Sequence, residues 1–290
     1  MATRHSDRLV TLGVAAFAAA LYLTFLGYGY QLEDEGTILY QILRTYRGER
    51  PYLDFNTGYT PAIFYMNAGL FRLFGVSVVP IRIALALGNV LAVVLVYRLA
   101  RRLAPVAESL CAALVYALFM PFFAGQFASF NIPYPAWYAV AAWLAAQIAS
   151  VRAVETGRRG WLVAAGAAAG VAFSFKPNTG VLGLGAVMLS QLLVSPPAAG
   201  PIGMLLEGVL LAVAAGGVAA TLNFEVDNLH FPFLAAPLLL LIAGAAWQRA
   251  VARGRGMTRP LGGALFDAGS ILLGFIGVCL LYTSPSPRDS

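Results

Sequence analysis

The stretch PIRIALALGNVLAVVLVYRLARRL, residues 80–103, decides the fold class. Its apolar part is long enough for a helix of about 20 residues, the length that crosses the hydrocarbon core of a bilayer. Arg98, Arg101 and Arg102 follow it, and arginines after an apolar run are typical of the cytoplasmic ends of membrane helices. We therefore predict a transmembrane helix over 77–98 whose carboxyl end faces the cytoplasm.

The composition of the whole chain supports the same class. Hydrophobic residues make up 60% of the 290 positions and charged residues only 11%, whereas soluble domains carry roughly 25% charged residues. So few charges do not cover a water-facing surface. The net charge of +6 comes from arginines placed at the ends of apolar runs, which favours membrane topology over nucleic-acid binding. The prediction is an all-α polytopic membrane protein.

Apolar runs of spanning length recur along the chain, and we predict about nine transmembrane helices. Alternate connections are basic, so the positive-inside rule puts the N-terminus in the cytoplasm and the loop 29–76 outside. The predicted spans are 9–28, 77–98, 106–124, 134–151, 161–176, 180–195, 203–222, 231–248 and 264–281. The basic connections hold Arg4 and Arg8; Arg98, Arg101 and Arg102; Arg152, Arg158 and Arg159; and Arg249, Arg253, Arg255 and Arg259.

The first outer loop contains two short helical patterns. In GTILYQILRTYRG, residues 36–48, the apolar side chains recur at helical spacing and Gly48 can end the helix. A second pattern, PAIFYMNAGLFRLFG, covers residues 61–75. We expect both helices to lie in the outer membrane–water interface.

The C-terminal residues do not continue this pattern. CLLYTSPSPRD, residues 279–289, resembles a reading frame of a common transposon-type sequencing adapter over eleven positions. We expect residues 1–278 to be one transmembrane domain, incomplete at its C-terminus, and residues 279–290 to be derived from the adapter. The alternative is a genuine polar tail.

Three consecutive acids follow the first apolar run, in QLEDEG at residues 31–36. Capping of the next helix needs only one of them. Three acids beside a low-dielectric boundary suggest a further task, such as a general base or a cation site. The sequence therefore singles out Glu33, Asp34 and Glu35 as candidates for chemistry.

The segment DEGTILYQILRTYRGERPYLDFNTGYTP, residues 34–61, resembles the first outer loop of GT-C membrane glycosyltransferases, closest to their protein O-mannosyltransferase-like branch and its bacterial lipid-modifying relatives. The features shared are the pair Asp34-Glu35, then Gly48, Tyr52, Asp54 and Pro61. One departure is TGYTP, where the family has a Pro-Pro turn. The resemblance covers roughly residues 9–195.

The resemblance implies inverting transfer of a sugar from a polyprenyl-phosphate donor to a lipid, glycan or protein acceptor on the outer face of a bacterial inner membrane. It implies that Asp34 is the catalytic base, with Glu35 tuning or positioning it. Such a reaction also needs cations for the leaving phosphate. Participation of a divalent cation is left open, and no nucleic acid is expected as a partner.

The phosphate binders should be cations of the outer face, and each has a second interpretation. Arg44 and Arg47 are spaced to face one phosphate, but they also suit a solvated or headgroup-facing helix surface. Lys176, the only lysine, can bind phosphate with help from Asn178, or can extend to the interface. Asp54 can orient the loop, contact the acceptor or be a turn residue. Arg50 and Arg72 complete the candidates.

Two other outer segments carry weaker signals. SFNIPYPAWY, residues 129–138, is typical of an interfacial aromatic belt, with a sugar or lipid contact as the alternative. Glu225, Asp227 and His230 can belong to a solvated loop or to a cation site.

A transporter or lipid flippase is the competing function, but it would place charges in mid-span. A non-catalytic scaffold leaves the three acids unexplained.

Overall fold

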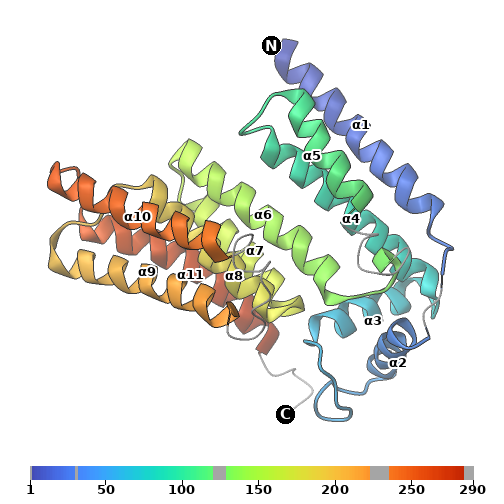
Figure 1. Cartoon of the computed structure of the whole chain (residues 1–290). Coiled ribbons are helices and arrows are strands. Elements are labelled where there is room, and N and C mark those ends of the chain that lie inside the picture. Colours follow the sequence, from blue (N-terminus) through green and yellow to red (C-terminus); the bar gives the residue numbers. More distant parts are fainter. Residues whose placement is uncertain (1, 30–31, 120–128, 223–234, 284–290) are drawn as a thin grey trace.

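A computed structural model of the chain describes residues 2–29, 32–119, 129–222 and 235–283, and all regular elements in these ranges are helical (Figure 1). This confirms the predicted all-α class. The α-helices are α1 (Ala2–Thr24), α2 (Asp34–Tyr46), α3 (Ala62–Phe74), α4 (Val78–Ala100), α5 (Val106–Phe119), α6 (Pro135–Thr156), α7 (Gly160–Phe175), α8 (Pro177–Val194), α9 (Gly200–Leu222), α10 (Ala236–Gly254) and α11 (Leu261–Thr283), with a short 3-10 turn η1 (Ser129–Asn131) before α6.

Six of the described helices are long and apolar enough to cross a membrane, as expected for a multi-pass membrane protein. They are α1, α4, α6, α8, α9 and α11. The other three predicted spans are not confirmed. Helix α7 has 16 residues and is only about 24 Å long at 1.5 Å per residue. Helix α5 has 14 residues before the undescribed segment 120–128, and α10 carries Arg249 and Arg253 in its last turns.

Local sequence signals explain where the helices begin and end. The Ser77 hydroxyl accepts a hydrogen bond from the Val79 amide at the start of α4. Pro135 and Pro177 occupy the first positions of α6 and α8, where a missing N–H costs nothing. Gly157 ends α6 in the left-handed conformation, with φ of 65°.

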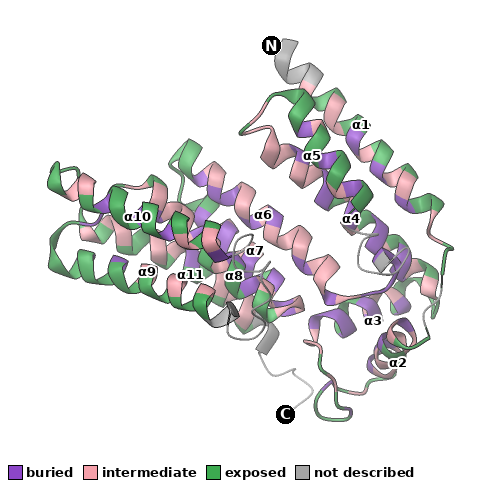
Figure 2. Ribbon diagram, viewed as in Figure 1, coloured by how far each residue is buried: buried purple, intermediate pink, exposed green. Residues whose placement is uncertain are grey.

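Helices α2 and α3 confirm the two helical patterns of the first loop. Gly48, with φ of 101°, follows α2, and Gly75, with φ of 83°, follows α3. The apolar faces of the two helices pack against each other and, with Ile81 and Leu85 of α4, form one cluster in which Ile38 and Ile63 are fully buried. Figure 2 shows these buried faces in purple. The placement of these helices in a membrane interface stays a prediction.

The helices run so that the basic connections meet at one end of the bundle. Arg102 after α4 pairs with Glu155 of α6, and Arg159 before α7 pairs with Asp267 of α11 at 3.1 Å. We call this the arginine-rich end. Helices α2 and α3 lie at the opposite end, below α4 and α6 in Figure 1, and we call it the α2–α3 end. The predicted alternation of the connections therefore matches the fold.

Glycines permit close contact between α7 and α11. A β-carbon on Gly166 would lie 1.9 Å from the Ile271 carbonyl oxygen, and one on Gly274 would lie 2.0 Å from the Val163 carbonyl oxygen. Distances this short are steric overlap, so both backbones need glycine here.

We expect Gly166→Ala to lower the melting temperature, because the added methyl group forces α7 and α11 apart. The cost is about 1–3 kcal/mol for overpacking of this kind. Thermal unfolding in detergent measures it. Gly185→Ala on α8 is the matched control, since a β-carbon there meets nothing within 4 Å. Equal melting temperatures of the two variants would contradict the close contact.

Residue 279, where the adapter-derived sequence is predicted to begin, lies inside α11. This helix continues to Thr283, past Val278, and residues 284–290 lie outside the described part. The assignment of residues 279–290 to a sequencing adapter stays a prediction.

Candidate functional site

The three consecutive acids have three different environments. The Glu33 side chain is exposed and makes no capping hydrogen bond to α2. Asp34, in the first turn of α2, is half-buried and accepts a hydrogen bond from the Tyr134 hydroxyl at its Oδ2 atom. Glu35 is buried, with 1% of its surface exposed. Helix capping therefore does not explain the cluster.

Glu35 forms a buried ion pair with Arg82 of α4. The Arg82 Nη2 atom lies 2.9 Å from Glu35 Oε1 and 3.0 Å from Oε2, and its Nε atom lies 3.1 Å from Oε1. Arg82 also donates to the carbonyl oxygens of Leu26, at 3.0 Å, and Gly29, at 2.6 Å. A buried guanidinium needs several acceptors to offset its desolvation, and these contacts supply them. The pair joins the end of α1, the start of α2 and α4.

A second buried side chain holds the same segment. The Asn131 Nδ2 atom, in η1, donates to the carbonyl oxygens of Phe25, at 2.8 Å, and Tyr28, at 3.1 Å. Because Tyr134 follows η1 by three residues, this contact brings the start of α6 to the segment that leads from α1 to α2. Together with the Glu35–Arg82 pair it places Asp34 next to Tyr134.

The charge of Asp34 acts on two tyrosines. Burial, the Asp34 hydrogen bond and the Asp34 charge all raise the pKa of Tyr134. Burial, with a smaller contribution from Asp34, raises the pKa of Tyr59. Both phenols therefore remain protonated at neutral pH and can act as hydrogen-bond donors.

A cavity of about 610 Å³ opens beside Tyr134, the residue that contacts Asp34. Its wall consists mainly of aromatic and other uncharged side chains, as in many small-molecule sites. The Thr60 hydroxyl donates to the Phe175 carbonyl at 2.5 Å, so the first loop closes against the end of α7. The lining residues are Gly58, Tyr59, Thr60, Tyr134, Pro135, Ala136, Trp137, Phe175, Lys176, Pro177 and Asn178. We call this the α2–α3-end cavity.

Among the predicted site residues, Lys176 and Asn178 line this cavity and Asp34 contacts one of its wall residues. Lys176 lies between α7 and α8, and the Asn178 Oδ1 atom accepts from the Thr179 amide at 2.8 Å. The amide nitrogen of Asn178 is then left to donate elsewhere. The structure thus brings Asp34 close to the cavity that Lys176 and Asn178 line, although Asp34 lies far from both in the sequence.

The other predicted residues do not line the cavity. The Arg44 Nε atom donates to Glu49 at 2.6 Å, and its guanidinium lies 4.8 Å from the centre of the Phe55 ring. Asp54 accepts from the Arg50 amide at 2.7 Å, the contact of a turn residue. Arg47 and Arg72 are exposed. Glu225, Asp227 and His230 lie outside the described residues.

The sequence analysis did not identify two residues of the site, Arg82 and Tyr134. Arg82 is a charge four residues into an apolar helix, and such a charge needs a buried partner; that signal was available. Tyr134 lies in the segment predicted as an aromatic belt, with sugar contact as the alternative. Its pairing with Asp34, 100 positions earlier, has no local signal.

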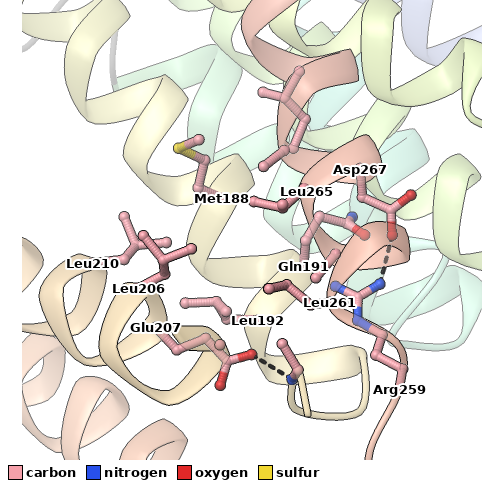
Figure 3. A pocket seen from close by; sticks show the side chains of 15 residues that line it. Met188, Gln191, Leu192, Leu206, Glu207, Leu210, Arg259, Leu261, Leu265 and Asp267 are labelled. Carbon is pink, nitrogen blue, oxygen red and sulfur yellow. Dashed lines mark hydrogen bonds and ion pairs between the residues drawn. The ribbon is translucent and has the colours of Figure 1, made fainter. Parts of the chain in front are cut away.

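A smaller cavity of about 110 Å³ lies at the arginine-rich end, between α8, α9 and α11 (Figure 3). Its two carboxylates are already paired. Glu207 accepts from Arg249, at 2.8 Å to Nε, from Arg253, and from the Ala198 amide at 2.8 Å. Asp267 accepts from Arg259 at 2.5 Å. The Glu207 contacts join α9 to α10, and Arg249 also donates to the Leu192 carbonyl of α8. We therefore assign this cluster to packing.

In the described parts of the chain, no three His, Cys, Asp or Glu side chains gather as metal ligands. At the α2–α3-end cavity, Asp34 is the carboxylate in contact with a wall residue, and its contact is a phenol.

The comparisons with known proteins give one match. The profile of the family described as dolichyl-phosphate-mannose-protein mannosyltransferase matches residues 58–203, half of the chain. This range contains Arg82, Tyr134, Lys176 and Asn178, and it begins after Asp34 and Glu35. No curated protein and no solved structure matches the chain.

Proposed function

Because the chain belongs to the dolichyl-phosphate-mannose-protein mannosyltransferase family, and is thus a GT-C-type membrane glycosyltransferase, we propose that it transfers a sugar from a polyprenyl-phosphate donor to a hydroxyl group. The acceptor is a lipid, a glycan or a protein. The observation that carries the proposal is the contact of Asp34 with Tyr134 at the wall of an aromatic cavity that also holds Lys176.

The chemistry needs few groups from the protein. The acceptor oxygen attacks C1 of the sugar, the bond from C1 to the phosphate oxygen breaks, and the polyprenyl phosphate leaves with the electron pair. Direct attack inverts the anomeric centre. A carboxylate takes the proton of the acceptor hydroxyl during the attack, and Asp34 is the group that we assign to this role.

The leaving phosphate needs positive charge and hydrogen-bond donors. Lys176 supplies the charge, Asn178 has side-chain amide protons to donate, and the positive end of the α8 dipole favours anions. Tyr59, Trp137 and Phe175 supply apolar and aromatic surface for a sugar ring or a lipid chain. All of these groups line the same cavity.

The basic connections support an orientation for this site. The arginines of the connections lie at the end of the bundle opposite to the cavity. By the positive-inside rule that end faces the cytoplasm. The α2–α3-end cavity then opens on the outer face of a bacterial inner membrane, where polyprenyl-phosphate sugars are accessible without a cytoplasmic domain.

The test supplies purified protein in liposomes with labelled polyprenyl-phosphate sugars and a crude membrane acceptor fraction. Transfer of label from at least one donor is the expected result. Nucleotide sugars serve as the comparison and should give no transfer. Folded protein that transfers no sugar from any polyprenyl-phosphate donor would contradict the proposal and favour a transporter.

We expect Lys176→Gln to raise the KM for the donor more than it lowers kcat. The reason is that the Lys176 ammonium group binds the donor phosphate both before and during transfer. A hydrogen bond to a charged group is worth about 1.5–3 kcal/mol, which corresponds to about a 10- to 100-fold weaker interaction. Initial rates at varied donor concentration measure both constants.

Arg158→Gln is the control for this change, because it removes the same charge from an exposed position at the arginine-rich end. It should leave both constants unchanged. A Lys176→Gln enzyme with the KM of the wild type would remove Lys176 from the phosphate site.

A further inference from the structure

The path from the α2–α3-end cavity to Asp34 leads through a tyrosine. The cavity is lined by Tyr134 and Tyr59, whereas Asp34 is not part of the wall. The hydroxyl of Tyr134 donates its proton to Asp34 Oδ2. Tyr134 therefore links the cavity, whose wall it lines, to the Asp34 carboxylate, which it contacts.

We propose that Tyr134 is a catalytic residue that relays the proton of the acceptor hydroxyl to Asp34. The inference rests on the proposed function and deepens it. As the acceptor oxygen forms its bond to C1, its proton passes to the Tyr134 oxygen and the phenolic proton passes to Asp34 Oδ2. The bond from C1 to the phosphate oxygen breaks in the same step. Tyr134 ends as it began, and Asp34 ends protonated.

The position of Tyr134 suits a relay, because its backbone is held on both sides. Its amide donates to the Ile132 carbonyl at 2.7 Å, and Pro135 follows it as the first residue of α6. Its ring packs against the apolar cluster formed by α2, α3 and α4. The phenol thus keeps one orientation while the two protons move.

The protonation states also suit a relay. A tyrosine phenol is protonated at neutral pH even at its ordinary pKa, and burial and the contact with Asp34 raise the pKa of Tyr134 further, so the phenol has a proton to give to Asp34. A concerted relay never requires a free phenolate. Tyr59 lines the same cavity and is affected by the Asp34 charge, but the hydrogen bond to the carboxylate comes from Tyr134. This contact distinguishes the two phenols.

The competing interpretation is that Tyr134 only positions Asp34, which then takes the proton directly. Tyr134→Phe separates the two, because the ring remains and only the hydroxyl is lost. A relay predicts that kcat falls by about 100-fold or more, as for the loss of a general base. It also predicts that Asp34→Asn combined with Tyr134→Phe is no slower than Asp34→Asn alone, because both changes interrupt one proton path. A positioning role predicts a fall of less than about tenfold. It shares the non-additivity, because it also acts through Asp34, so the size of the fall and the solvent isotope effect separate the two roles.

The solvent isotope effect gives a second measurement. Two protons that move in one step give a curved dependence of the wild-type rate on the deuterium fraction, and Tyr134→Phe should make it linear. Tyr65→Phe is the control, because it removes a phenol from an exposed position on α3. Its kcat and melting temperature should equal those of the wild type, and Tyr134→Phe should keep the same melting temperature.

The outcomes separate this inference from the function on which it rests. An active wild type, an inactive Asp34→Asn variant and a Tyr134→Phe variant within tenfold of wild type would overturn the relay alone. A wild type that transfers no sugar from any polyprenyl-phosphate donor would overturn the proposed function itself.

Discussion

Replacement of Asp34 by asparagine is expected to lower kcat by about 10²- to 10⁴-fold, the usual contribution of a general base. Asparagine has the same shape, and its carbonyl oxygen still accepts the hydrogen bond of Tyr134. It cannot take a proton from the acceptor at neutral pH. The loss should therefore appear in kcat, with little change in the KM for the donor.

Initial rates with a labelled polyprenyl-phosphate sugar measure this effect. Glu33→Gln is the matched control, because it removes the same charge one residue earlier from an exposed side chain. Its kcat should equal that of the wild type, and both variants should melt at the wild-type temperature. Equal rates of Asp34→Asn and the wild type would exclude Asp34 as the base.

The second large effect concerns stability. We expect Glu35→Ala to destabilise the fold by about 3–5 kcal/mol, since removal of one partner of a buried ion pair leaves an uncompensated charge. Here the charge left behind is Arg82, of which only 7% is exposed. The lost contacts join α2 to α4, and the guanidinium that they leave without its carboxylate also holds the segment after α1, so the α2–α3 end should loosen.

Thermal unfolding in detergent and the yield of folded protein measure this change. Glu33→Ala removes the neighbouring exposed acid and should have no effect. The double variant Glu35→Leu/Arg82→Met should recover part of the stability, because apolar residues of similar volume can replace a buried pair. A Glu35→Ala variant as stable as Glu33→Ala would show that the pair does not hold the segment.

The pair Asp34-Glu35 shows how far a motif can be interpreted locally. The resemblance implies that Glu35 tunes or positions Asp34 as its neighbour. In the helix, successive residues are rotated by about 100°, so the two side chains leave α2 in different directions. Glu35 reaches Arg82 in the core and Asp34 reaches Tyr134. We therefore infer that Glu35 positions Asp34 indirectly, through the segment that it anchors.

Arg44 shows the same limit for a cation. Its spacing from Arg47 predicts a shared phosphate, but Glu49 lies close enough to pair with it once Gly48 turns the chain after α2. The turn places a carboxylate five residues away next to the guanidinium. Helical spacing alone does not include that reversal of the chain.

Local features of the chain were sufficient for the membrane class, for most helix boundaries and for the alternation of basic connections, because apolar length, proline, glycine and arginine act within a few residues. The composition of the site depended on contacts between distant segments. Arg82 meets Glu35 across 47 positions and Tyr134 meets Asp34 across 100. Which residues become partners depends on how α2, α4 and α6 pack. The packing of helices that are distant in the sequence produces no periodic pattern in it.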